Sequence, residues 1–348
     1  MSQHGPLIPR SPPNMCTAAS LSPAPQSRID PPQRCLVTAG NRVHLLLSTN
    51  SLFLQHTAVC LMSLLANNSD LFFDIVVVGR EKEPLDEEKL RRSLVRFPNH
   101  LLRFREFIPP TDILLPLPGD FYTIETWARL WVEEYFPPEV DRVLYLDGDI
   151  VIVDSIAPLW NTDLSGALLG AVDIPGSEAV TRLGLSAEDG YFNAGVLLID
   201  LAQWRETGAL QTVLDFVSAH PERIRTVDQD ALNACFHGRR KQLDYKWNVI
   251  RPFFREPLAL PLPRAEIEAV RRAARIIHFN GASKPWNYLC DHPRKAEYEK
   301  YLRLTEWRDF VPPDRTPLNR LRKGISAILP YPVKRVLKTV AARIASPR

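Results

Sequence analysis

Two carboxylates separated by one glycine, Asp147-Gly148-Asp149, follow the apolar run at residues 142–146. Glycine allows the chain to turn where a strand runs out, so that both side chains can serve one ligand. Carboxylate oxygens suit a divalent cation such as Mg²⁺ or Mn²⁺, which in proteins commonly bridges the phosphates of a substrate. The motif therefore indicates metal-assisted chemistry on a phosphate-bearing substrate. The alternative is an Asp-rich turn that caps the next element, and only partners elsewhere in the chain decide between the two.

The segments around this motif alternate between strand and helix patterns, and this alternation predicts an α/β fold with a mostly parallel, twisted sheet and helices on both faces. The expected strands are residues 43–47, 72–78, 101–107, 142–146, 167–172, 195–199 and 276–279, and the expected helices are 54–65, 85–97 and 125–135. In such sheets, ligands bind outside the carboxyl ends of the strands. We expect Asp147, Asp149 and His278 to project there together.

Length and composition bound the protein class. A chain of 348 residues with 45% hydrophobic residues can bury a substantial core in one large domain or two ordinary ones. A formal net charge of +3 gives no support for nucleic-acid binding. The five cysteines have no Cys-x-x-Cys spacing, which argues against a zinc site or a disulfide framework and for a reducing compartment. With neither a signal peptide nor an apolar run of about 18 residues, we expect a cytoplasmic protein.

Five segments read together resemble glycosyltransferase family 8. They are Trp127-Ala128-Arg129-Leu130, Val143-Leu144-Tyr145-Leu146-Asp147-Gly148-Asp149, Tyr191-Phe192-Asn193-Ala194-Gly195-Val196, Asp228-Gln229-Asp230-Ala231-Leu232-Asn233 and His278-Phe279-Asn280-Gly281-Ala282-Ser283-Lys284-Pro285-Trp286. The likeness runs from about residue 43 to about residue 307 and is nearest to the bacterial lipopolysaccharide and lipooligosaccharide galactosyl- and glucosyltransferases. It implies a GT-A fold over residues 41–310. It also implies that galactose or glucose passes, with retention of anomeric configuration, from a UDP-sugar to a glycan or lipid-linked saccharide.

The resemblance implies that Asp147, Asp149 and His278 hold Mn²⁺, or alternatively Mg²⁺, against the donor diphosphate. A buried core histidine is the alternative for His278, which lies between two apolar residues. Gly281 and Lys284, which follow it, favour the metal site. Gly281 allows close approach of the backbone to a phosphate, and Lys284 supplies a cation for the departing β-phosphate.

Other matched residues are expected to bind the donor sugar and assist the reaction. The resemblance places Asn193, Ala194 and Gly195 against the ribose and the transferred sugar, with an ordinary turn before a strand as the alternative. Arg129 is expected to reach the diphosphate or the sugar, and an exposed arginine on an amphipathic helix is its alternative.

The catalytic pair implied by the resemblance is Asp228, which binds sugar hydroxyls, and Gln229, which lies on the β-face of the anomeric carbon. Without the resemblance, Asp228 is a plain helix N-cap. Front-face attack within an ion pair is the preferred route, and a double displacement is the alternative.

The turn after the first strand departs from the family pattern. Relatives carry acidic residues and a tyrosine there that contact uracil and ribose, whereas this chain has Ser48-Thr49-Asn50-Ser51-Leu52. Thr49 and Asn50 are the residues expected to bind the base through hydrogen bonds. The difference weakens the inference of UDP as the nucleotide and leaves a catalytically weak or inactive sugar-nucleotide-binding protein as an alternative.

Both ends of the chain differ from its centre. Residues 1–40 are Pro-rich and are expected to be disordered. Residues 311–348 form a basic amphipathic helical tail, expected to consist of two helices that lie on an anionic membrane surface at the inner face of the cytoplasmic membrane. A solvated helix packed on the protein body is the alternative. From residue 320 onward the cations are Arg320, Arg322, Lys323, Lys334, Arg335, Lys338, Arg343 and Arg348.

A second enzyme class also uses an Asp-x-Asp motif at the end of a strand. Haloacid-dehalogenase-like phosphatases use the first aspartate as a nucleophile, but they continue with Gly-Thr, where this chain has Ile150-Val151. This alternative is therefore less favoured. The donor sugar, the acceptor, the linkage and the oligomeric state are not predicted by the sequence.

Overall fold

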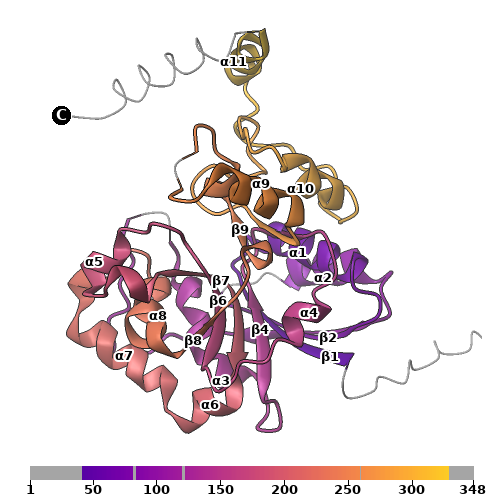
Figure 1. Ribbon diagram of the computed structural model, residues 1–348. Helices are drawn as coiled ribbons and strands as arrows, with labels where there is room; N and C mark the ends of the chain where they lie inside the picture. The colour runs from indigo at the N-terminus through magenta and orange to yellow at the C-terminus, as the bar shows by residue number, and fades with distance from the viewer. Residues whose placement is uncertain (1–40, 81–83, 120–121, 259, 329–348) are drawn as a thin grey trace, which may run out of the picture. The chain divides into compact units, whose positions relative to one another are not determined.

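The protein, described by a computed structural model over residues 41–80, 84–119, 122–258 and 260–328, is built around a mixed sheet. Within these ranges seven strands form this sheet in the order β3-β2-β1-β4-β7-β6-β8 (Figure 1). They are β1 (Arg42–Ser48), β2 (Phe72–Gly79), β3 (His100–Glu106), β4 (Arg142–Leu146), β6 (Leu169–Asp173), β7 (Phe192–Asp200) and β8 (Arg240–Gln242). Pairing is parallel from β3 to β4 and between β6 and β8, and only β7 runs antiparallel to its neighbours. The predicted mostly parallel α/β sheet is confirmed.

The reversed strand β7 determines how the site is assembled. Because β7 is antiparallel to β4, its first residues meet the last residues of β4, and Leu146 pairs with Val196. The Asp147 amide continues this ladder by donating to the Gly195 carbonyl at 2.8 Å. The expectation that Asn193 to Gly195 precede a strand is corrected, since they lie inside β7.

A smaller sheet of three strands carries His278. Its order within the described residues is β5-β10-β9, with β5 (Ile150–Ile152), β9 (Val249–Ile250) and β10 (Ile276–His278). The prediction that the strand of His278 joins the main sheet is wrong. An apolar run indicates a buried strand, but it does not indicate which other strand this strand pairs with. His278 pairs antiparallel with Ile150, the residue directly after Asp149. This pairing brings the histidine beside the aspartates.

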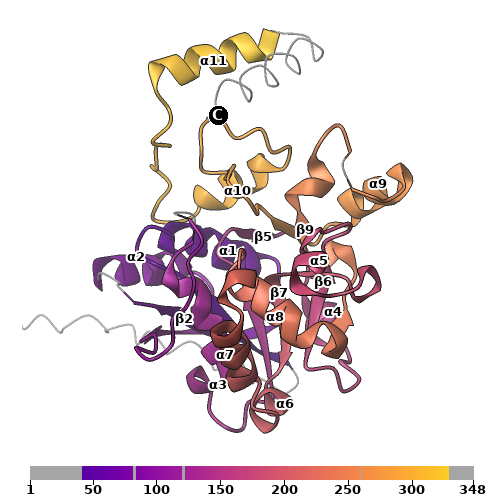
Figure 2. The same cartoon turned by 90° about the vertical axis from the view of Figure 1, so that its left-hand side faces the viewer.

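Helices cover both faces of the main sheet, as predicted. Alternate residues of β1 enter two hydrophobic clusters, with Leu45 and Leu47 in one and Leu46 in the other. The first cluster contains α1 (Leu54–Ala66) and α2 (Pro84–Leu94), and the second contains α3 (Val132–Tyr135), α6 (Leu201–Glu206), α7 (Ala209–Ala219) and α8 (Asp228–Phe236). Figures 1 and 2 both show α7 and α8 together, on the other side of the sheet from α1 and α2. The remaining α-helices described are α4 (Ala157–Trp160), α5 (Ala179–Leu183), α9 (Arg264–Ala273), α10 (Lys295–Leu302) and α11 (Pro317–Ile328).

The helix expected at 125–135 is mostly a 3₁₀ helix. The segment η2 (Ile124–Trp131) is 3₁₀, and α3 continues it as one α-helical turn. In a 3₁₀ helix residues three apart lie along one line, and Ile124, Trp127 and Leu130 have this spacing. Apolar residues at this spacing are equally typical of an α-helix, so the pattern could not separate the two.

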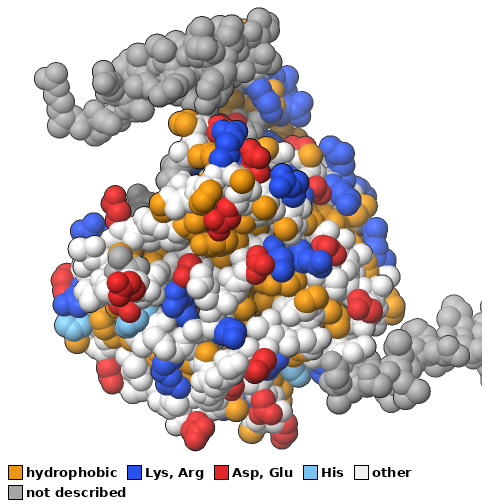
Figure 3. All heavy atoms as spheres, viewed as in Figure 1, with side chains coloured by type: hydrophobic (Ala, Val, Ile, Leu, Met, Phe, Trp, Pro, Cys, Tyr) orange, Lys and Arg blue, Asp and Glu red, His pale blue; other side chains and the backbone are white. Residues whose placement is uncertain are grey.

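The chain after residue 310 contains α11, the first of the two helices expected in the basic tail. Its residues Leu318, Leu321 and Ile325 expose their side chains. The second expected helix and the Pro-rich segment 1–40 lie outside the described residues. Among the residues described, no helix combines the length and hydrophobicity that a bilayer crossing requires. Acidic and basic side chains are interspersed on the face shown in Figure 3, which agrees with the small net charge.

Candidate active site

Two adjoining pockets lie where β4, β7 and β10 end or begin. Every residue predicted for the site lines one or both of them. The first pocket contains Thr49, Asn50 and one side of the Asp147–Asp149 turn, and the second contains Asn193, Ala194, Gly195, Asp228, Gln229, His278 and Gly281. Arg129, Asp147, Asp149 and Lys284 line both pockets. The site is therefore one continuous region with the two aspartates at its centre.

The two aspartates and His278 converge. One ligand atom from each of Asp147, Asp149 and His278 lies within 4.8 Å of the others. The Nε2 atom of His278 is 3.2 Å from Oδ1 of Asp149 and 3.6 Å from Oδ2 of Asp147. Gly148 allows the turn between the aspartates to pack against α1, since a Cβ at this position would lie 3.0 Å from the Thr57 hydroxyl oxygen.

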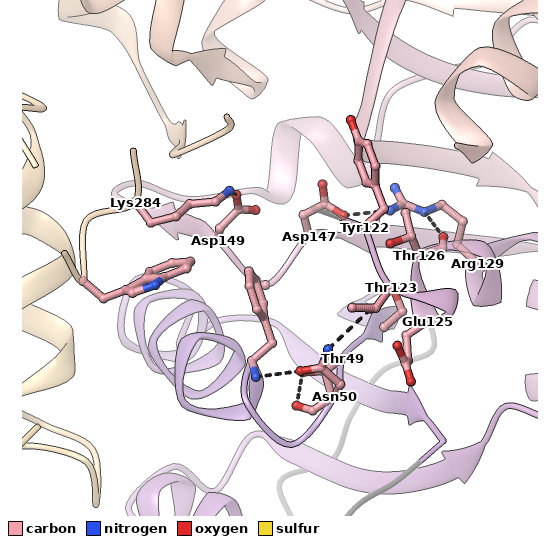
Figure 4. A pocket seen from close by; sticks show the side chains of 14 residues that line it. Thr49, Asn50, Tyr122, Thr123, Glu125, Thr126, Arg129, Asp147, Asp149 and Lys284 are labelled. Carbon is pink, nitrogen blue, oxygen red and sulfur yellow. Dashed lines mark hydrogen bonds and ion pairs between the residues drawn. The ribbon is translucent and has the colours of Figure 1, made fainter. Parts of the chain in front are cut away.

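Each carboxylate has one oxygen held by the protein and one directed toward His278. Oδ1 of Asp147 accepts hydrogen bonds from the Tyr145 hydroxyl at 2.9 Å and from Arg129 at 3.0 Å. Oδ2 of Asp149 accepts a hydrogen bond from the Lys284 ammonium, as Figure 4 shows. Burial opposes ionisation of Asp149, but Lys284 and His278 together hold the pKa of this carboxyl well below its usual value. Asp147 Oδ2, Asp149 Oδ1 and His278 Nε2 thus form an oxygen-oxygen-nitrogen donor set.

A chain of amides determines which nitrogen of His278 carries the proton. The Gly195 amide donates to Oδ1 of Asn193 at 3.0 Å, which orients the Asn193 side chain. The same oxygen accepts from Nδ2 of Asn248 at 2.8 Å, so Oδ1 of Asn248 faces Nδ1 of His278 at 2.9 Å. Nδ1 of the histidine must therefore donate, so in a neutral imidazole the lone pair is on Nε2, which faces the carboxylates.

This donor set fits a divalent cation. When His278 is neutral, its Nε2 lone pair and the two carboxylate oxygens face one another, and a bound cation is attracted to all three atoms. A hydrogen bond that orients the second ring nitrogen is typical of histidines that bind metals. Mixed oxygen and nitrogen ligands suit a borderline cation such as Mn²⁺ and also accommodate Mg²⁺. These residues therefore fit the metal that the motif indicated.

Gln229 is held in one orientation by a second network. Its Oε1 accepts from Nδ2 of Asn193 at 2.9 Å and from the Ala194 amide at 3.0 Å. Its Nε2 donates to the Tyr191 hydroxyl at 2.9 Å, and this hydroxyl donates to Asp230 at 2.7 Å. The Gln229 oxygen is thus occupied by two donors from β7.

Asp230 stabilises an unusual turn before α8. Its carboxylate is fully buried, pairs with Arg182 and accepts from the Arg225 and Thr226 amides at 2.7 Å. Between these amides and α8, Val227 has φ 51°, which is a strained conformation for a β-branched residue. The Asp230 interactions hold this turn and place Asp228 and Gln229 at the pocket.

Asp228 and Arg129 form a buried ion pair. Arg129 is only 5% exposed, which excludes the alternative of a surface arginine, and its guanidinium lies over the Tyr145 ring at 4.1 Å. Its Nε is 2.9 Å from Oδ2 of Asp228 but donates its hydrogen bond to the Thr126 carbonyl. This carboxylate oxygen therefore has an ion pair but no hydrogen-bond partner among the residues that the structure describes. Burial raises the pKa of Asp228 to about 7, against the opposing effect of Arg129. Asp228 is the first residue of α8 and not its N-cap, which is Val227.

The first pocket contains an aromatic ring that was not predicted from the sequence. Phe53 lines this pocket one residue beyond the turn at residues 48–52, which has no aromatic side chain. Oδ1 of Asn50 accepts from the Phe53 amide at 2.9 Å, and Nδ2 of Asn50 donates to Thr123 at 3.4 Å (Figure 4). Asn50 therefore organises the turn that carries Phe53, in addition to lining the pocket.

Further functional side chains came only from the structure. Tyr145, Tyr191 and Asn248 each contact a predicted site residue through a hydrogen bond, and Asp230 accepts a hydrogen bond from Tyr191. Three of them lie inside the quoted motifs, and their place in those motifs was the available signal. Asn248 lies outside those motifs, and no local feature distinguishes it from an ordinary turn residue.

Known proteins resemble this chain over the same region. The sequence profile of glycosyl transferase family 8 matches residues 44–290. The chain is 32% identical over 157 residues to General stress protein A of Bacillus subtilis (strain 168) and 26% identical over 139 residues to lipopolysaccharide 1,2-glucosyltransferase of Escherichia coli (strain K12). These matches cover 43% and 40% of this chain and 54% and 41% of those relatives, so the chain spans about half the length of each.

A solved structure shares the fold. It is the galactosyltransferase LgtC in complex with donor and acceptor sugar analogs, with a TM-score of 0.67 at 24% identity. The superposition covers 78% of this chain and 98% of that chain. The likeness shows that the protein has the GT-A fold.

Proposed function

Because the chain belongs to glycosyl transferase family 8, we propose that it is a retaining transferase that moves galactose or glucose from a UDP-sugar to a glycan or lipid-linked saccharide. The observation that carries this proposal is the convergence of Asp147, Asp149 and His278 within 4.8 Å, in a pocket that Arg129 and Lys284 also line. A nucleoside diphosphate needs such a combination, in which ligands for a cation lie beside cationic side chains that neutralise phosphate.

The residues of the site divide by the part of the donor that they contact. Asp147, Asp149 and His278 hold Mn²⁺ or Mg²⁺, and the bound cation supplies positive charge to the diphosphate. Lys284 contributes a second positive charge to the β-phosphate, assisted by the left-handed backbone at Gly281 (φ 83°). Asn193, Ala194 and Gly195 border the ribose and the sugar, and Thr49 and Asn50 border the base.

The reaction needs little acid catalysis, because a nucleoside diphosphate is a good leaving group once its charge is neutralised. The bond between the anomeric carbon and the β-phosphate oxygen breaks, and its electron pair leaves with the nucleotide. The acceptor hydroxyl forms the new bond on the same face, and its proton passes to the departing phosphate oxygen. Asp228 holds sugar hydroxyls, and the Gln229 amide lies beside the developing positive charge. Since two donors occupy the Gln229 oxygen, the geometry favours this front-face route over a double displacement through Gln229.

Donor turnover tests the proposal. UDP-galactose and UDP-glucose are first compared by the Mn²⁺-dependent rise in melting temperature that they cause. We then expect slow UDP release from the preferred donor, dependent on Mn²⁺ and reduced about 10²- to 10³-fold in Asp149→Ala, since a charge that stabilises the leaving group is lost. Binding without turnover would instead indicate a sugar-nucleotide-binding protein. Release of phosphate from simple esters would indicate the haloacid-dehalogenase-like chemistry.

The acceptor and the location form a separate part of the proposal. Residues 41–310 act as the transferase domain, and residues 311–348 attach it to an anionic membrane surface, where a lipid-linked acceptor is found. The exposed Leu318, Leu321 and Ile325 on α11, together with the neighbouring Arg322 and Lys323, support this attachment. Full-length protein should sediment with vesicles that contain anionic lipid, and a protein truncated after Pro313 should not. Equal sedimentation of the two proteins would contradict the attachment.

A further inference from the structure

A carboxylate faces the first pocket at the end away from the metal ligands. This pocket has Asp147, Asp149 and Lys284 at one end and Asn50, Thr123 and Glu125 at the other (Figure 4). On the proposed function, the diphosphate occupies the first end, so the nucleoside extends to the second. We propose that Glu125 selects the nucleobase of the donor by accepting the ring N–H of uracil. The inference rests on the proposed function. It assigns to Glu125 the contact with the base that the family pattern assigns to acidic residues in the turn after the first strand.

The polar groups of that turn are already engaged within the protein. The Thr49 hydroxyl donates to the Asn50 carbonyl and accepts from the Thr57 hydroxyl at 3.0 Å. Oδ1 of Asn50 accepts the Phe53 amide, and one hydrogen of Nδ2 is directed to Thr123. The side-chain oxygens of Thr49 and Asn50, the two residues expected to bind the base, therefore already accept hydrogen bonds within the protein.

Glu125 is the available acceptor on the facing wall. Its side chain is half-buried, and within the described residues its carboxylate has no hydrogen-bond or ion-pair partner. Among the described residues that line this pocket, it is also the only carboxylate outside the Asp147–Asp149 turn. An ionised carboxylate accepts hydrogen bonds and donates none, so it favours a base that presents an N–H.

The position of Glu125 on η2 matches the length of a nucleoside. Glu125 precedes Arg129 by four residues on the 3₁₀ helix, which corresponds to about 8 Å along the helix axis. Arg129 contacts Asp147 at the phosphate end. The rings of Phe53 and Trp286, which pack edge to face at 5.2 Å, line the pocket and supply its apolar surface.

The chemistry distinguishes uracil from cytosine. N3 of uracil carries a hydrogen that Glu125 can accept, whereas N3 of cytosine carries a lone pair that a carboxylate repels. An amide in place of the carboxylate can rotate and donate to the cytosine N3. Glu125→Gln therefore has the same size as the natural residue but should not discriminate between the two pyrimidines.

Calorimetric titration with UDP and CDP in the presence of Mn²⁺ tests the proposal. We expect the natural protein to bind UDP at least about 10-fold more tightly than CDP, because hydrogen bonds to charged groups contribute an effect of this size. In Glu125→Gln the preference should fall to about 3-fold or less. Glu134→Gln, on the exposed surface of α3, is the matched control and should keep the full preference. The melting temperature of each variant verifies folding.

The outcomes separate this inference from the proposed function. An unchanged preference for UDP in Glu125→Gln overturns the role of Glu125 and leaves the transferase proposal standing. Equal or tighter binding of CDP by the natural protein also overturns it. If neither nucleotide binds the natural protein in the presence of Mn²⁺, the proposed function itself fails, and this inference fails with it.

Discussion

Oδ1 of Asn248 accepts a hydrogen bond from Nδ1 of His278 at 2.9 Å, although the two residues are 30 positions apart in the chain. Asn248 is fully buried, and its amide orientation is set through Asn193 by the backbone amide of Gly195. The orientation of one peptide group in β7 thus determines that Nε2 of His278 is the nitrogen available to a cation. Asn248 is a positioning residue, because it acts on the metal through His278.

Replacement of Asn248 should weaken cation binding. We expect Asn248→Ala to bind Mn²⁺ about 10- to 100-fold more weakly, as is typical when the partner of a metal-binding histidine is removed. Asn248→Asp retains an oxygen acceptor for Nδ1 and should bind Mn²⁺ more tightly than Asn248→Ala. Titration calorimetry measures the affinities, and Asn161→Ala, at an exposed turn, is the control. Equal affinities in Asn248→Asp and Asn248→Ala would contradict the positioning role.

A side chain at position 195 should block the metal site without disturbing the fold elsewhere. A Cβ on Gly195 would lie 2.7 Å from Oδ2 of Asp147 and nearer still to the His278 ring. We expect Gly195→Ala to lose detectable Mn²⁺ binding in the same titration. Gly238→Ala is the matched control, since a Cβ there meets no atom within 4 Å and its backbone has an ordinary φ. Normal Mn²⁺ affinity in Gly195→Ala would show that the cation binds elsewhere.

Removal of the Tyr191 hydroxyl should free the Gln229 amide to rotate. Tyr191→Phe deletes the acceptor of Nε2 of Gln229, while Asp230 keeps its bonds to Arg182 and to two backbone amides. We expect kcat for UDP release to fall about 3- to 10-fold, the effect of one neutral hydrogen bond, with little change in KM for the donor. Tyr135→Phe, in a buried position outside both pockets, is the comparison. A rise in KM at constant kcat would place Tyr191 in donor binding instead.

The raised pKa of Asp228 predicts a specific pH dependence of stability. In the metal-free folded protein Asp228 keeps its proton up to about pH 7, whereas its pKa in the unfolded chain is near 3.8. Between these values the unfolded state binds fewer protons, so the contribution of Asp228 to the free energy of unfolding decreases as pH rises. Asn at this position does not titrate. As the pH rises to 7, the free energy of unfolding of the natural protein should therefore fall relative to that of Asp228→Asn, by up to about 1.4 kcal/mol per pH unit. Above pH 7 we expect no further relative loss.

Urea unfolding of both proteins in EDTA at pH 5, 6, 7 and 8 measures this difference. The two stability curves should separate progressively up to pH 7 and run parallel above it. A constant difference from pH 5 to pH 8 would mean that Asp228 is already ionised throughout, held by Arg129. The same constant difference would follow if the ion pair lowered the pKa of Asp228 below its unfolded value, because that titration lies below pH 5.

The local pattern of the chain was enough to predict most of the elements and the residues at their ends. Apolar and β-branched runs predicted β1, β2, β4, β6 and β7 to within a few residues, because burial on both faces of a sheet requires such runs. The edge strand β3, which is only partly buried, was also predicted to within a few residues. The acidic turn at Asp147 and Asp149 was predicted because these residues directly follow the apolar run that forms β4. The resemblance to a family then supplied the distant residues, and the structure places all of them at one site.

Tertiary structure decided what the pattern left open. The spacing in residues 125–131 fits both 3₁₀ and α helices, and the run at 276–278 does not state which strand it joins. Pairing of β10 with β5, rather than with the main sheet, is what brings His278 to the aspartates. Hydrogen bonds such as Asn248 to His278 and Tyr191 to Asp230 join residues 30 or more positions apart. Their formation depends on how the buried strands and helices pack, which sequence periodicity does not specify, since it records only which side of each element is buried.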